Sequence, residues 1–176
     1  MPAIDLPRLR AAIRDVPDFP KPGILFKDIT PVLADGELFK MAVDCFVAAA
    51  REHAVEKIVG IDARGFLFAA AAAYELGIGF VPVRKKGKLP YRCESAAYQL
   101  EYGEATVEMH VDALRAGERV VIIDDLLATG GTAAASVKLV RQMGADIAEV
   151  LFFIELRFLD GRRNLAGVPV RSFIDF

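Results

Sequence analysis

Residues 120–132 of the chain read VVIIDDLLATGGT. The apolar run from Val120 to Ile123 has no polar alternation, which is typical of a strand in a parallel sheet that helices cover on both faces. Two carboxylates, Asp124 and Asp125, follow this run directly, and after a turn the segment from Thr129 to Thr132 opens a helix. Because ligands of open α/β sheets bind beyond the carboxyl ends of the strands, this stretch predicts both a fold class and the place of a site.

The segments on both sides of this stretch follow the same plan. Short apolar runs predict further buried strands at residues 58–61, 80–83 and 147–154. Apolar residues spaced by three and four predict helices at residues 6–16, where Pro17 ends the helix, and at 39–50, 65–76 and 133–143. This alternation predicts an α/β fold, with one domain over residues 1–176 and a mostly parallel, twisted sheet that has helices on both faces.

One segment departs from this plan. Tyr98, Leu100 and Tyr102 alternate with polar residues, and the alternation resumes in residues 107–111. A period of two predicts a half-exposed antiparallel hairpin. We expect the charged loop before it, residues 84–97, to carry the hairpin as a cover over a site.

The composition excludes several classes of protein. The chain has 176 residues, with 22 Lys and Arg against 24 Asp and Glu, so it lacks the basic surface that nucleic-acid binding requires. Its two cysteines, Cys45 and Cys93, stand in no zinc or disulfide pattern. No apolar stretch reaches the ~20 residues of a membrane span, and the charged N-terminus does not resemble a secretion signal. We therefore expect a soluble, cytoplasmic protein with no nucleic-acid or membrane partner.

The loop after the two aspartates has the composition of a phosphate-binding turn. Thr129, Gly130, Gly131 and Thr132 place backbone N–H groups at a helix N-terminus, where the helix dipole favours an anion. The P-loop lysine is missing, and the neighbouring carboxylates suit the vicinal hydroxyls of a ribose, so the combination favours a sugar phosphate. The simpler alternatives are a solvated strand end for the aspartates and an ordinary N-cap for Thr129.

The same residues resemble the phosphoribosyl-diphosphate (PRPP) signature of type I phosphoribosyltransferases. Four more segments, in the same order, are similar to the adenine phosphoribosyltransferase family: FPKPGILFKDITPVL at 19–33, GIDARGFLFA at 60–69, RKKGKLP at 84–90 and LEYG at 100–103. The resemblance implies the type I phosphoribosyltransferase fold. It also implies an N-terminal hood over residues 1–35 and a lid over residues 84–111.

Within the signature, the resemblance assigns the binding of PRPP and of the product AMP to seven residues: Asp124, Asp125, Ala128, Thr129, Gly130, Gly131 and Thr132. Relatives that use 6-oxopurines usually carry Asp where this chain has Ala128, so Ala128 indicates adenine. A site that matches the hydrogen-bonding edge of adenine leaves polar groups unpaired with hypoxanthine.

A second set of residues resembles the pyrophosphate-binding residues of the family: Asp62, Ala63, Arg64, Gly65, Arg84 and Lys88. The first four join a strand to a helix, so their N–H groups suit a diphosphate. In the family this loop commonly contains a non-proline cis peptide, here between Asp62 and Ala63, and usually has Ser in place of Ala63. Arg84 reaches the diphosphate from the neighbouring subunit, which implies a homodimer.

The resemblance also assigns the base and the catalytic group. Main-chain groups that match Leu25, Phe26 and Lys27 read adenine, and Phe26 stacks on its ring. Glu101, on the polar face of the hairpin, matches the catalytic carboxylate of the lid. Residues 91–94 replace the continuation with Gly and Pro that is common in the family, so the sequence of the lid departs from the family pattern there.

Together these expectations describe one reaction of purine salvage, in which adenine and PRPP give AMP and pyrophosphate. Mg²⁺ is expected as a cofactor that is held mainly through PRPP, without a dedicated protein cage. Two alternatives stay open: a PRPP-binding regulator without catalysis, and a phosphoribosyltransferase for another purine.

Overall fold

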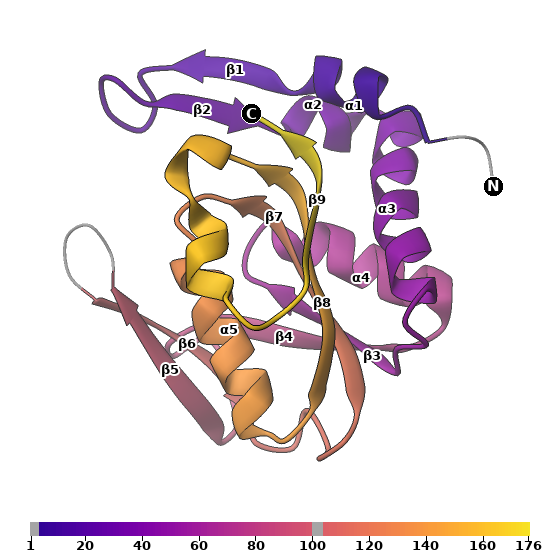
Figure 1. Cartoon of the computed structure of the whole chain (residues 1–176), viewed down its shortest axis with the longest axis vertical. Helices are drawn as coiled ribbons and strands as arrows, with labels where there is room; N and C mark the ends of the chain where they lie inside the picture. Colours follow the sequence, from indigo (N-terminus) through magenta and orange to yellow (C-terminus); the bar gives the residue numbers. More distant parts are fainter. Residues whose placement is uncertain (1–3, 100–103) are drawn as a thin grey trace. The chain divides into compact units, whose positions relative to one another are not determined.

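The computed structural model describes residues 4–99 and 104–176. The chain forms two compact units, Met1–Cys45 and Phe46–Phe176, and the helix α3 (Gly36–Arg51) begins in the first and ends in the second (Figure 1). One domain over residues 1–176, with a hood over residues 1–35 and a lid over residues 84–111, stays a prediction. Within the described ranges, no helix combines the length and apolarity that a membrane crossing requires.

The first unit also contains α1 (Leu6–Ala12), the antiparallel strands β1 (Arg14–Pro17) and β2 (Leu25–Asp28), and α2 (Thr30–Ala34). The prediction of one helix up to Pro17 is wrong, because the backbone of Ile13 is extended and residues 14–17 pair with β2. Arg14 and Asp28 lie opposite each other in this pairing and form an ion pair of 2.7 Å. Strand pairing therefore replaces the last turn of the predicted helix.

A seven-stranded sheet organises the second unit, in the order β5-β6-β4-β3-β7-β8-β9 (Figure 1). The strands are β3 (Lys57–Ile61), β4 (Gly79–Lys85), β5 (Cys93–Gln99), β6 (Glu104–His110), β7 (Arg119–Leu127), β8 (Asp146–Glu155) and β9 (Val170–Asp175). The five strands from β4 to β9 in this order run parallel, and β6 and β5 continue the sheet antiparallel. The mostly parallel sheet is confirmed, while β9 has no counterpart in the prediction.

Alternate residues of the central strands face different helices. Val59 of β3 belongs to a buried cluster with residues of α5 (Gly131–Gln142), whereas the next residue, Gly60, faces α4 (Gly65–Leu76). A Cβ at Gly60 would lie 2.7 Å from the Cβ of Ala69, so the absence of a side chain lets α4 pack closely. Helices therefore cover both faces, as the unbroken apolar strands indicate.

Strand β7 continues beyond its predicted end. The sequence predicts a turn directly after Asp125, but Leu126 and Leu127 remain paired with β8. The turn is therefore confined to residues 128–130, between β7 and α5. Two short 3₁₀ helices, η1 (Arg157–Leu159) and η2 (Gly161–Leu165), connect β8 to β9.

The predicted hairpin is present as β5 and β6, which pair antiparallel along their described length. Its base continues the main sheet, since Arg84 and Lys85 at the end of β4 pair with β6. The predicted loop over residues 84–97 is too long, because only residues 86–92 lie between the end of β4 and the start of β5. The tip, residues 100–103, lies outside the described residues.

Candidate functional site

The loops that follow β3 and β7 leave the sheet at the same edge, because the two strands are parallel neighbours. Residues 62–64 lead from β3 into α4, and residues 128–130 lead from β7 into α5. The start of α4 packs closely against β7 at Gly65, where a Cβ would lie 2.7 Å from Asp124 Oδ1 and 3.0 Å from the carbonyl oxygen of Ile123. Any other residue at this position would push α4 away from the aspartates.

A cleft of about 490 Å³ lies at this edge, within the range typical of small-molecule sites. It is lined by Asp62, Ala63, Arg64, Arg84, Lys85, Lys88, Asp124, Asp125, Leu126 and Thr132. All of these except Lys85 and Leu126 are residues that the sequence analysis assigned to PRPP or pyrophosphate. The fold therefore brings five of the six predicted pyrophosphate residues and three of the seven predicted PRPP residues into one cleft. The other five predicted residues are not among its lining: Gly65, Ala128, Thr129, Gly130 and Gly131.

Two arginine–aspartate pairs lie in the cleft. Arg64 Nε is 2.5 Å from Asp125 Oδ2, and Arg84 Nε is 2.9 Å from Asp62 Oδ2. Arg84 also donates a hydrogen bond of 3.2 Å to the backbone oxygen of Lys88. Asp125 is 7% exposed, whereas the side chain of Arg64 is 42% exposed, so this pair presents its cationic end to the solvent. Such guanidinium groups are suited to phosphate oxygens.

The loop at residues 62–65, which the resemblance assigns to the diphosphate and which is called the diphosphate loop below, has the backbone that the resemblance implies. The peptide between Asp62 and Ala63 is cis. The loop runs directly into α4, whose first turn carries no side-chain cap. The backbone N–H of Asp62 donates to the carbonyl oxygen of Val83 at 2.9 Å, and the residues after it lie at a helix N-terminus, where an anion is favoured.

Asp124 is partly buried at the end of the sheet. Its Oδ1 accepts a hydrogen bond of 2.8 Å from the backbone N–H of Asp125. Burial, and after it the neighbouring carboxylate of Asp125, raise the pKa of Asp124 well above its ordinary value. Hydroxyl groups that donate to both carboxylates would replace part of the hydration that Asp124 has lost.

The loop before α5 presents N–H donors. Gly130 has a φ of 81°, in the left-handed region that favours glycine. In the described part of the chain, no group accepts a hydrogen bond from the backbone N–H groups of residues 129–132. Unpaired N–H groups at a helix N-terminus are the usual arrangement for binding a phosphate.

The sequence relationships agree with this arrangement. Residues 33–162 match the phosphoribosyl transferase domain family. An adenine phosphoribosyltransferase of Acidothermus cellulolyticus is 55% identical over 175 residues, which are 99% of each chain. The chain belongs to the adenine phosphoribosyltransferase family.

Solved structures of this family have the same fold. The adenine phosphoribosyltransferase of Thermoanaerobacter pseudethanolicus is 50% identical and superposes with a TM-score of 0.95, covering 98% of this chain and 100% of the other. The enzyme of Saccharomyces cerevisiae, solved with adenine and 2,5-dideoxy-2,5-imino-altritol 1,6-bisphosphate, is 43% identical with a TM-score of 0.91, covering 96% of this chain and 97% of the other. The type I phosphoribosyltransferase fold expected from the sequence is thus confirmed.

The resemblance assigns four further residues, three to the binding of adenine and one to catalysis. Leu25, Phe26 and Lys27 lie on β2 in the first unit, where the ring of Phe26 packs edge-on against Phe19 at 5.1 Å between centroids. Glu101 lies outside the described residues. The roles of these four residues toward adenine stay predictions.

The sequence analysis assigned no role to Lys85 or Leu126, although both line the cleft. Lys85 is the last residue of β4, which ends at the same edge as β3. The sequence signal that could have indicated Lys85 is its place in the basic run between Arg84 and Lys88. Leu126 was not found, because β7 was predicted to end before it.

The raised pKa of Asp124 predicts that this carboxylate destabilises the free protein at neutral pH. The folded chain keeps the proton at pH values where the unfolded chain has lost it, so stability falls as the pH rises from the ordinary value of 3.8 through the raised one. Asp124→Asn retains the oxygen acceptor and removes the charge. We expect a gain of about 0.5–2 kcal/mol in the free energy of urea unfolding at pH 7, of the size common for relieved active-site strain.

The matched control is Asp112→Asn, which removes the charge of an exposed aspartate in the turn after β6. The Asp124→Asn variant should also lose the fall in stability with rising pH, and the control should keep it. An unchanged or lower unfolding free energy for Asp124→Asn at pH 7 would contradict the account of Asp124.

Proposed function

We propose that the protein transfers the phosphoribosyl group of PRPP to adenine, giving AMP and pyrophosphate, and so acts in purine salvage. The observation that carries the proposal is the single cleft in which the loop at residues 62–65 meets Asp124 and Asp125. Membership of the adenine phosphoribosyltransferase family supports it, as does the related yeast enzyme that was solved with adenine.

Three groups of residues bind three different parts of PRPP. In the proposal, the 5′-phosphate binds the N–H groups of residues 129–132, and the ribose hydroxyls donate to Asp124 and Asp125. The diphosphate lies between the loop at residues 62–65 and the cations of the cleft. The phosphate and the diphosphate meet N–H donors and cations, and the neutral ribose hydroxyls meet carboxylate acceptors, which makes the cleft specific for a sugar that is phosphorylated at both ends.

The reaction breaks the bond between C1′ and the diphosphate oxygen while N9 of adenine attacks C1′. In the transition state the ribose ring gains positive charge and the leaving diphosphate gains negative charge. Arg64, Arg84 and Lys88 would stabilise the leaving group, since electrostatic stabilisation is strongest in a cleft that excludes water. Glu101 would stabilise the purine or accept the proton that adenine loses as N9 attacks. The hairpin over the cleft would keep water from C1′.

The donor groups of the cleft fit Mg²⁺. In the parts of the chain that the structure describes, no cluster of three His, Cys, Asp or Glu side chains is placed to form a metal cage. Mg²⁺ commonly keeps several waters and binds through substrate phosphates, so in the proposal it is held mainly through PRPP, beside the carboxylates of Asp124 and Asp125. Bound in this way, Mg²⁺ would neutralise charge on the diphosphate.

Adenine is the proposed base because Ala128 stands where relatives that use 6-oxopurines usually carry Asp. A regulator that binds PRPP without catalysis is the second candidate, and a phosphoribosyltransferase for another purine is the third. The near-neutral charge of the chain gives no support for a nucleic-acid-binding regulator. A cytoplasmic location is part of the proposal.

A turnover assay separates these candidates. With PRPP and Mg²⁺ present, we expect release of pyrophosphate with adenine, and rates at least about 100-fold lower with hypoxanthine, guanine or orotate, because the wrong base leaves buried polar groups unpaired. Binding of PRPP without turnover of any base would favour the regulator, and faster turnover of guanine or hypoxanthine would favour the third candidate.

The role of Glu101 predicts a loss in kcat. Glu101→Gln keeps the size of the side chain and removes its charge, so we expect kcat with adenine to fall by about 100-fold or more, as is typical for the loss of a positioned acid or base. Glu104→Gln, at the first described residue of β6, is the matched control and should keep kcat. If kcat survives in Glu101→Gln, the assignment of Glu101 is wrong.

A homodimer is a further part of the proposal. The helix α4, which follows the diphosphate loop, has large apolar side chains on its outer face: Leu67 is 45% exposed and Tyr74 is 88% exposed. Ala70, between them on the same stripe, is also exposed. An apolar stripe of this kind favours a protein interface. A second copy on this face would lie beside the loop at residues 62–65. Arg84 lines the cleft of its own chain and pairs with Asp62 there, so the proposed homodimer rests on the apolar stripe of α4.

Charged side chains on this stripe should dissociate the dimer. We expect the double variant Leu67→Glu, Tyr74→Glu to sediment as a monomer and to lose at least about 10-fold in kcat/KM, because two like charges on an isologous interface face their own copies. Glu75→Gln on the same helix is the control. A wild-type protein that sediments as a fully active monomer would contradict the homodimer.

A further inference from the structure

The loop at residues 128–132, called the phosphate loop below, packs against η2. None of the predicted site residues lies in η2. A Cβ at Gly161 would lie 2.2 Å from the carbonyl oxygen of Ala128, and a Cβ at Gly130 would lie 2.4 Å from the carbonyl oxygen of Gly161. No side chain fits at either position. The two glycines therefore allow a backbone-to-backbone contact between the loop and the start of η2.

A side chain of η2 bonds directly to the same loop. Asn164 Nδ2 donates a hydrogen bond of 2.7 Å to the carbonyl oxygen of Thr129. The acceptor is a backbone atom of the loop whose N–H groups are proposed to bind the 5′-phosphate. Asn164 is thus one peptide unit away from a proposed ligand contact.

Because the peptide group is planar, a hydrogen bond to the carbonyl oxygen of Thr129 also fixes the direction of the N–H of Gly130. Cis peptides occur in the described chain at Phe19–Pro20 and Asp62–Ala63, so the peptide between Thr129 and Gly130 is trans. In a trans peptide the C=O and the following N–H point in opposite directions. Because Asn164 holds the oxygen of Thr129, it also directs the N–H of Gly130 to the far side of the loop, away from η2.

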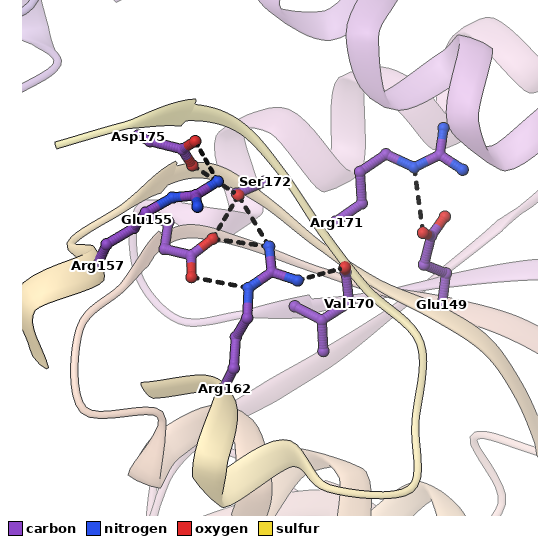
Figure 2. A network of polar contacts seen from close by, with 8 residues as sticks. All are labelled: Glu149, Glu155, Arg157, Arg162, Val170, Arg171, Ser172 and Asp175. Carbon is purple, nitrogen blue, oxygen red and sulfur yellow. Dashed lines mark hydrogen bonds and ion pairs between the residues drawn. The ribbon is translucent and has the colours of Figure 1, made fainter. Parts of the chain in front are cut away.

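A charged clamp holds η2 in place (Figure 2). Arg162 donates two hydrogen bonds of 2.7 Å to the two carboxylate oxygens of Glu155, and a third of 2.9 Å to the backbone oxygen of Val170. Its Nη2 also lies 3.1 Å from Ser172 Oγ, which donates to Glu155. Glu155 is 4% exposed, and Arg162 holds the pKa of that carboxyl below its ordinary value. The clamp joins η2 to both β8 and β9, so Asn164 projects from a braced segment.

We propose that Asn164 is a positioning residue that orients the N–H groups of the phosphate loop, and that Arg162 braces η2 behind it. Asn164 touches neither the base nor the diphosphate in this assignment. Its effect is therefore confined to the end of the substrate that carries the 5′-phosphate. The inference rests on the proposed function, since it names the geometry by which that function binds PRPP and AMP.

The test compares PRPP with adenine in steady-state kinetics of the full chain. Asn164→Asp is nearly isosteric and replaces the amide donor by a carboxylate. We expect it to raise KM for PRPP and the dissociation constant of AMP by about 3- to 10-fold, the size of one hydrogen bond, while KM for adenine changes by less than about 2-fold. Asn164→Gln, which retains an amide donor, should recover part of the loss.

Arg163→Ala is the matched control, because Arg163 is the exposed neighbour of Asn164 on η2. We expect its kinetics to equal those of the wild type. A merely structural role of Asn164 would lower the melting temperature and the active fraction and leave both KM values unchanged. That result would overturn the inference.

Two further outcomes separate this inference from the proposed function. If the wild type binds AMP and turns over adenine, and Asn164→Asp does so with an unchanged KM for PRPP, only the inference fails. If calorimetry detects no binding of AMP or PRPP to the wild type, both fail. Should Asn164→Asp not fold, Arg162→Lys, which breaks the two-pronged contact with Glu155, must show the same rise in KM for PRPP alone.

Discussion

Strands β3 and β7 pair in parallel, with Lys57 opposite Val120 and Gly60 opposite Ile123, so the chain leaves both strands at one edge of the sheet. The close approach of Gly65 to Asp124 then sets the distance between the diphosphate loop and the aspartates. The other features of the cleft follow from this pairing, because each loop inherits its position from the strand before it. Parallel pairing turns two separate sequence motifs into one binding surface.

Both arginines of the cleft are paired with aspartates. Arg64 with Asp125, and Arg84 with Asp62, hold each cation beside a carboxylate of the same chain. Such pairs limit the motion of the long arginine side chains, so a diphosphate would meet donors that are already positioned. Asp124 differs from these paired groups. Its burial makes its charge costly, and in the proposed function its contact with the ribose hydroxyls makes that charge useful.

The central strands could be predicted because an apolar run that is buried on both faces needs no knowledge of its partners. Strand β9 could not, since Arg171 and Ser172 interrupt its apolar pattern and are matched by buried glutamates of β8 only after folding. The same limit applies within the site. The loops could be predicted because their residue types form short motifs of neighbouring residues. The contact of Asn164 with Thr129 joins residues 35 positions apart, so no such motif indicates it.

The end of β4 belongs to two structures at once. Arg84 and Lys85 line the cleft, and they also pair with Glu108 and Val107 of β6 in the sheet. Glu108 accepts a further hydrogen bond from the backbone N–H of Gly87, which ties the connecting loop to the same strand. The hairpin and the basic end of β4 are therefore joined by strand pairing, so a tilt of β5 and β6 would also shift the guanidinium of Arg84. In the proposed function, access to the cleft and affinity for a diphosphate would then change together.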